Sequence, residues 1–214
     1  MLRKFLLIPC VFILLECKNH KTPLDTVLEF PNPSIQTIIK NKKNHEIQIL
    51  LSQIKRSSSG KILFTESNFQ VDEKKYFYPA STAKLPIVIL TLQKLNELRT
   101  QGKKISIETS FIVKNQKGKT IFKTDTTNPN GLVTIGHLIK KIFLVSDNDA
   151  YNYLFDFLGR DYINMELSKR GLHNTKLYHK FLKGADNINT WEYIFFDKNN
   201  DTLYHQTSIK SKMK

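Results

Sequence analysis

The residues best suited to do chemistry are Ser81 and Lys84, in the segment Ser81-Thr82-Ala83-Lys84. An apolar stretch from Leu85 to about Leu98 follows them and predicts a deeply buried helix. Positions i and i+3 are neighbours on a helix. A serine attacks poorly unless a neighbour accepts its proton, and an amine whose pKa is lowered by burial can do this. We therefore predict a serine nucleophile with a lysine partner at a helix start, where unpaired N–H groups can stabilise an oxyanion.

The pattern Ser-x-x-Lys is not specific by itself in a lysine-rich chain. It also occurs at Ser52/Lys55, Ser58/Lys61 and Ser211/Lys214. Only the copy at Ser81 opens a strongly apolar helix, so we interpret the other copies as solvated surface. Pro86 conflicts with a regular helix, because it removes a backbone donor. Either the chain bends just after Ser81 or the regular helix begins a residue or two later.

A second polar motif, Ser146-Asp147-Asn148, lies between two predicted helices. Thr134 can cap the first helix, whose apolar residues end at Val145. The second begins near Ala150, and Gly159 is its expected C-cap. A purely structural interpretation makes the motif a capped junction, with Asp147 or Asp149 as the N-cap.

The two motifs and their flanks together resemble the class A serine β-lactamases and the related penicillin-binding proteins. The flanks are Tyr-Pro-Ala-Ser-Thr-Ala-Lys-Leu-Pro around Ser81 and the helix pair around Ser146, and the resemblance covers residues 45–178. It implies that Ser81 attacks a β-lactam or D-alanyl carbonyl, that Lys84 takes part in proton transfer and that Ser146 relays a proton to the leaving nitrogen. It also implies that Asn148 contacts the substrate and helps hold Lys84, that Asp147 is structural, and that neither a metal nor an organic cofactor is needed.

The chain departs from the family pattern in two places. No Lys-Thr-Gly or Lys-Ser-Gly motif occurs in the sequence. The region 178–184 lacks the glutamate that activates the deacylating water in class A enzymes, and Glu192, the nearest downstream candidate, lies in a predicted strand. We therefore expect a family member that is truncated at its C-terminus, with sheet strands missing and reduced stability.

The predicted fold class is α/β (α+β): the two-lobe β-lactamase/transpeptidase fold, with a helical lobe and an incomplete antiparallel sheet. We predict a lipoprotein-like signal peptide over residues 1–17, a proline-containing tether over residues 18–33 and one hydrolase domain over residues 34–214. Within the domain, Ser34 is expected to cap a short helix. A hairpin follows, with strands over 46–54 and 61–71 joined by the turn at Gly60.

The N-terminus resembles a bacterial lipoprotein signal. Arg3 and Lys4 precede an apolar run that is too short to span a bilayer, and Cys17 follows it as the expected lipidation site. Glu16 replaces the small residue usual before that cysteine, so cleavage as an ordinary secretory signal and an uncleaved anchor remain alternatives. In each case we expect an exported protein, which is either periplasmic or anchored to the membrane as a lipoprotein. Processing at Cys17 would remove Cys10 and leave no internal disulfide.

The composition, with 40% hydrophobic and 24% charged residues, predicts a folded chain. The formal net charge of +14 comes mainly from dispersed lysines, which favours a solvated basic surface over attraction to wall polymers or membranes. No nucleic-acid-binding motif is present, and we expect a monomer. Three functions remain open: a β-lactamase, a penicillin-binding type of acyl-enzyme that acts on wall peptides or deacylates slowly, and an inactive remnant or binding module.

Overall fold

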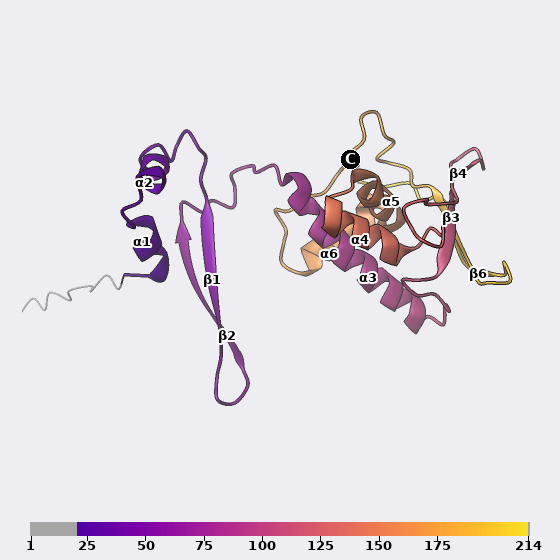
Figure 1. Ribbon diagram of the computed structural model, residues 1–214, viewed down its shortest axis with the longest axis horizontal. Coiled ribbons are helices and arrows are strands. Elements are labelled where there is room, and N and C mark those ends of the chain that lie inside the picture. Colours follow the sequence, from indigo (N-terminus) through magenta and orange to yellow (C-terminus); the bar gives the residue numbers. More distant parts are fainter. Residues whose placement is uncertain (1–20, 214) are drawn as a thin grey trace, which may run out of the picture. The chain divides into compact units, whose positions relative to one another are not determined.

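The computed structural model describes residues 21–213, which form two compact units that divide between Lys75 and Tyr76 (Figure 1). We predicted one domain over residues 34–214, whereas the division falls inside it. Residues 71–79 contain neither helix nor strand, and residues 71–78 are exposed. The chain therefore passes from one unit to the other through an exposed segment without regular secondary structure. The predicted signal peptide, with Cys10 and Cys17, lies outside the described residues.

The first unit contains two short helices and a hairpin. Their bounds are Pro23–Leu28 (α1), Pro33–Lys40 (α2), Ile49–Arg56 (β1) and Ile62–Phe69 (β2). Helix α1 lies in the segment that we expected to be a tether. The capping box of Thr22 and Asp25 explains it, because each satisfies a backbone N–H of the other. The cap of α2 is Asn32 rather than the expected Ser34.

The predicted hairpin is present, with β1 and β2 antiparallel along their whole length. Ile54 lies opposite Phe64, and side chains of opposed residues share a face of the ladder. Both are exposed, at 68% and 64%. Leu50, two pleats from Ile54 on the same face, is also exposed. One face of the hairpin is therefore apolar and accessible.

The second unit combines helices with an antiparallel sheet. The 3-10 helix Ala80–Ala83 (η1) leads into the α-helices Lys84–Thr100 (α3), Ile135–Val145 (α4), Asn148–Leu158 (α5) and Arg160–Lys169 (α6). The sheet has the order β4-β3-β5-β6, with the bounds Ser110–Lys114 (β3), Thr120–Phe122 (β4), Glu192–Phe196 (β5) and Thr202–Gln206 (β6). This mixed α/β arrangement confirms the predicted fold class (Figure 1).

The core of the second unit joins its helices to its sheet. Phe111 of β3 lies 5.0 Å from Phe195 of β5 between ring centroids, and Phe157 of α5 lies 5.7 Å from the same ring. Helix α3 contributes Ile87 and Leu90, which are almost wholly buried. Among the described residues, every member of the main apolar cluster lies between Ala83 and Phe195. This core fixes α3 and α5, the helices that carry the candidate site.

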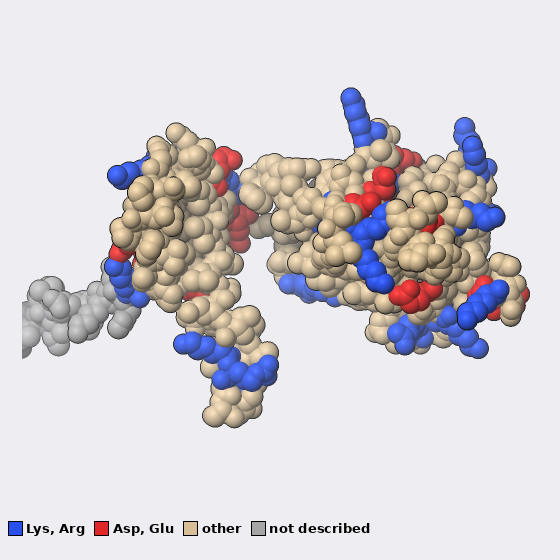
Figure 2. All heavy atoms as spheres, in the orientation of Figure 1, with Lys and Arg blue, Asp and Glu red and all other residues tan. Residues whose placement is uncertain are grey.

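Basic residues are dispersed over the visible face of both units rather than gathered in one patch (Figure 2). This distribution agrees with the scatter of lysine along the sequence. No helix within residues 21–213 is long and apolar enough to cross a bilayer.

Candidate active site

Ser81 lies in η1, immediately before the regular helix α3 begins at Lys84. Pro86 therefore falls in the first turn of α3, where its missing N–H breaks no helical hydrogen bond. Ala80, just before Ser81, has a φ of 46°, a left-handed conformation that is uncommon for alanine. The backbone N–H of Ser81 donates to no acceptor within residues 21–213. It meets the requirement for an oxyanion donor that the sequence suggested.

Ser146 lies at the turn between α4 and α5. Thr134 caps the start of α4, as predicted, and Ser146 closes its end in the left-handed conformation, with φ 55° and ψ 41°. Asp147 then caps α5, and its Oδ1 accepts the N–H of Ala150 at 2.7 Å. The tight reversal brings Ser146 and Asn148 to one place. Non-glycine residues in this conformation cost about 1–3 kcal/mol and cluster at functional sites.

The predicted polar residues meet around the Lys84 amine. Its Nζ donates to the carbonyl oxygen of Ser146 at 2.5 Å, to Ser146 Oγ at 2.8 Å and to Asn148 Oδ1 at 2.7 Å. Ser81 Oγ lies 3.4 Å from the same nitrogen and accepts from Ser146 Oγ at 3.2 Å. Ser81, Lys84, Ser146 and Asn148 therefore form one connected polar cluster.

The surroundings of Lys84 favour loss of its proton. The side chain is almost wholly buried, and burial lowers the pKa of Lys84, although the carboxylate of Asp147 opposes this shift. The Ser146 carbonyl and Asn148 Oδ1 can only accept. A neutral amine has two N–H groups for these two acceptors and one lone pair. That lone pair would face the Ser146 and Ser81 hydroxyls.

A loop after α6 adds a group that the sequence did not identify. The ring of Phe181 lies 5.5 Å from Lys84 Nζ and stacks on Tyr151 of α5 at 4.4 Å. The N–H of Phe181 donates to Asn152 Oδ1 at 2.7 Å. From the sequence, this region was notable only for the glutamate it lacks. Asn152, one helical turn beyond Asn148, was the available signal, because both side chains share a face of α5.

A buried ion pair fastens the same loop to α5. The Lys180 amine contacts the Asp156 carboxylate, and the two side chains are 2% and 0% exposed. Burial raises the pKa of Asp156, while the Lys180 amine opposes the shift. The carboxylate also accepts the N–H of Trp191 at 2.6 Å. This buried pair of lysine and aspartate was likewise not predicted.

Glu192, the downstream candidate for a base, lies on β5 and pairs with His205 of β6 at 2.5 Å. No hydrogen bond joins it to Ser81 or Lys84 in the described part of the chain. Cys17, the expected lipidation site, lies outside that part. No cluster of three or more His, Cys, Asp or Glu side chains within residues 21–213 could hold a metal ion.

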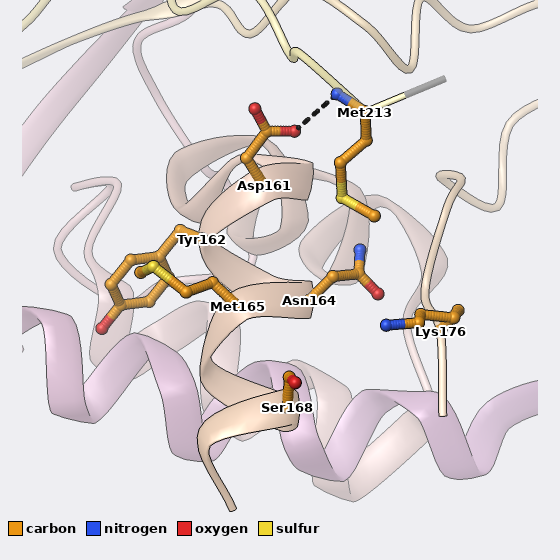
Figure 3. Close-up of a pocket in the computed structure, with 7 residues that line it drawn as sticks. All are labelled: Asp161, Tyr162, Asn164, Met165, Ser168, Lys176 and Met213. Carbon is orange, nitrogen blue, oxygen red and sulfur yellow. Dashed lines mark hydrogen bonds between the residues drawn. The ribbon is translucent and has the colours of Figure 1, made fainter. Parts of the chain in front are cut away.

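A hollow in the described part of the chain lies elsewhere, on α6 (Figure 3). It is open, measures about 530 Å³ and is lined mainly by α6 residues together with Lys176 and Met213. The N–H of Met213 donates to Asp161 beside it. None of the clustered residues around Lys84 lines this hollow, so it is not the candidate active site.

The comparison with protein families gives a match over most of the chain. The sequence matches the beta-lactamase enzyme family over residues 32–208, a range that contains the whole polar cluster around Lys84. No curated protein is similar enough to count as a match. The match covers most of the chain and supports hydrolase activity of the β-lactamase type. The chain therefore belongs to the beta-lactamase enzyme family.

Proposed function

We propose that this chain is a serine hydrolase of the class A type, which opens β-lactams by forming an acyl-enzyme at Ser81 and then hydrolysing it. One observation carries the proposal: Lys84 Nζ is held against two obligate acceptors, while the hydroxyls of Ser146 and Ser81 lie 2.8 and 3.4 Å away. This arrangement supports the proposal, because the buried Lys84 amine lies within reach of the exposed Ser81 hydroxyl and could accept its proton.

The geometry supports an acylation step in which the proton of Ser81 ends on the leaving nitrogen. The proton of Ser81 passes to Lys84, directly or through the Ser146 hydroxyl, as Ser81 Oγ bonds to the lactam carbonyl carbon. The Ser81 N–H stabilises the oxyanion. The carbon–nitrogen bond then breaks, and Ser146 passes a proton from Lys84 to the leaving nitrogen. Attack by water on the ester would complete hydrolysis and restore the serine.

A penicillin-binding type of enzyme with slow deacylation is the second candidate. One observation favours it: no carboxylate within residues 21–213 hydrogen-bonds to Lys84, and the loop 178–184 contains no glutamate. Such an enzyme would act on D-alanyl wall peptides. The absence of Lys-Thr-Gly from the sequence leaves an inactive remnant as the third candidate.

The decisive test is the intact mass of the full chain after mixing with a penicillin. Wild type should gain the mass of one antibiotic, Ser81→Ala should gain none, and Ser58→Ala, from another Ser-x-x-Lys copy, should behave as wild type. Fast decay of the adduct identifies a β-lactamase, and slow decay identifies the penicillin-binding alternative. A folded wild type that gains no mass and consumes no antibiotic would refute the serine hydrolase proposal for this chain.

We also propose an exported, monomeric protein held to a membrane through lipid on Cys17, with no nucleic-acid partner. The support is the basic and apolar sequence before that cysteine. Incorporation of a labelled fatty acid in wild type, and its loss in Cys17→Ser, is the expected result. Equal labelling of both proteins, or none in either, would contradict lipidation at this residue.

A further inference from the structure

The ring of Phe181 is held in a fixed place beside the Lys84 amine. Tyr151 stacks on it at 4.4 Å with an interplanar angle of 24°, and His179 approaches it edge-on at 6.1 Å. The Phe181 N–H is bound by Asn152, and Tyr151 donates its hydroxyl to the carbonyl of His179 at 3.2 Å. Two contacts therefore hold the ring, one holds the Phe181 N–H and one holds the backbone of the neighbouring His179, all from α5 or from the loop itself.

Lys84 meets oxygen acceptors and this aromatic face. The oxygens come from η1, from the turn between α4 and α5 and from the first residue of α5, whereas Phe181 comes from the loop after α6. An ammonium within about 6 Å of a ring centroid is attracted by the negative face of the ring. A neutral amine is attracted less. The ring therefore favours the protonated form, in opposition to burial.

Few charged groups compete with the ring for control of Lys84. Asp147, from the turn before α5, is the carboxylate that acts on the amine. Lys180 of the loop is committed to Asp156, and the ring of His179 packs against Tyr78 and Phe181. Asn148, Ser146 and Ser81 are uncharged. The aromatic ring therefore raises the proton affinity of Lys84 together with the carboxylate of Asp147 and the oxygens that accept hydrogen bonds from the amine.

We propose that Phe181 is a positioning residue that sets the proton affinity of Lys84, and so the pH range in which Ser81 is acylated. The second part rests on the proposed function, whereas the first does not. The residue does not touch the reacting atoms and acts through Lys84. A ring at this position holds the amine charged to a higher pH than an aliphatic side chain would.

The test compares Phe181→Leu and Phe181→Trp with wild type, each as the full chain. The titration of Lys84 is followed directly by the Cε chemical shift of carbon-labelled lysine, assigned with Lys84→Arg. Leucine keeps the site apolar but removes the ring face, so the midpoint should fall by about half to one pH unit. Tryptophan has the stronger face, so its midpoint should equal or exceed that of wild type. The low-pH limb of the acylation rate should shift in the same directions.

Phe155→Leu is the matched control, because Phe155 also packs on Tyr151, at 5.9 Å, and forms no cation–π contact with Lys84. Its midpoint should match that of wild type. Equal midpoints for wild type and Phe181→Leu would overturn the proposal, as would equal shifts in the Phe155 and Phe181 variants. If Phe181→Leu does not fold, a midpoint of Phe181→Trp below that of wild type overturns it. Absence of any adduct, with the titration shifted as expected, would refute the proposed function and leave this inference intact.

Discussion

Single residues around Lys84 determine what the site can do. The amine donates to the carbonyl of Ser146 and to Asn148 Oδ1. In the neutral form its lone pair therefore faces the serine hydroxyls. Arginine could not reproduce this, because its guanidinium stays charged and has no lone pair to accept a proton. The proposed chemistry therefore depends on a lysine that is both buried and able to titrate.

Replacing Lys84 with methionine should abolish proton transfer while keeping a side chain of similar length. General bases contribute about 10²–10⁴-fold, so we expect acylation of Ser81 to slow by that factor, measured as the rate of mass gain with a penicillin. Lys61→Met, in an exposed Ser-x-x-Lys copy, is the control and should react as wild type. An unchanged rate in Lys84→Met would show that the lysine is not the base.

Lys94 of α3 gives the molecule a pH-dependent stability. Its amine donates to the carbonyl of Phe157 and to Gln206 Oε1, and burial lowers its pKa from 10.5 to about 7, while Glu97 and Asp156 oppose the shift. Between pH 7 and 10 the unfolded chain then binds a proton that the folded chain has lost. The free energy of unfolding should therefore rise with pH in this window.

We expect the free energy of unfolding to rise less steeply with pH in Lys94→Met than in wild type. The slope should fall by at most about 1.4 kcal/mol per pH unit, the value for one whole proton. Urea unfolding of both proteins at pH 7, 8 and 9 measures it. Lys84 contributes in the same direction, because its pKa is also lowered, so a residual slope is expected in the variant. Parallel slopes in wild type and variant would contradict the assignment to Lys94.

Among the elements, α5 organises the site. Its first residue, Asn148, binds Lys84, and one turn on Asn152 binds the backbone of Phe181. Asp156, a further turn along, pairs with Lys180. One face of a single helix therefore holds both the amine and the loop that carries the aromatic ring.

Removal of the Asp156 charge should loosen the loop. Asp156→Asn leaves Lys180 buried without a counter-charge, and breaking a buried pair in this way costs about 3–5 kcal/mol. The control is Lys169→Gln, which disturbs a pair whose lysine is 60% exposed and should cost about 1 kcal/mol or less. Chemical denaturation measures both, and amide exchange at residues 178–187 should accelerate only in Asp156→Asn.

The sequence was enough to predict the elements with strong local patterns. The apolar run of α3, the apolar periodicity of α4 and the caps Thr134 and Gly159 are local signals. The structure contains these helices and caps, but α3 is not buried on every side, because Leu85, Ile89 and Leu92 are exposed. The clustering of Ser81, Lys84, Ser146 and Asn148 followed from two motifs and a resemblance. The ring of Phe181 and the Asp156–Lys180 pair could not be predicted, because they depend on where a loop without periodicity packs. Helix α1 was not predicted, because the prolines of this segment suggested an irregular tether and the capping box before the helix was overlooked.

On the scale of the whole molecule, the two units differ sharply in their cores. Within the described residues, Leu24 is the buried apolar side chain of the first unit, while the main apolar cluster lies wholly in the second. The hairpin of the first unit also exposes Ile54 and Phe64. Apolar burial is the dominant favourable term in folding, so the second unit should be much the more stable of the two.

Limited proteolysis tests this difference. Trypsin should cleave after Lys74 or Lys75, which lie in the exposed segment without helix or strand, and leave a folded fragment that begins near Tyr76. Lys74→Gln/Lys75→Gln should slow this cleavage. The fragment should also gain mass with a penicillin at the rate of the full chain, because all clustered site residues, from Ser81 onward, lie after the cleavage site. Rapid digestion of the second unit instead would show that it depends on the first.

The left-handed backbone at Ser146 has a consequence for how this gene can change over generations. Glycine adopts that conformation without steric cost, whereas serine does not. A single replacement of Ser146 by glycine would therefore ease the backbone and delete the hydroxyl together. Selection for folding alone would favour the replacement, and only selection for the reaction would oppose it. The residue at this position therefore indicates whether selection for folding alone or selection for the reaction has acted on a lineage.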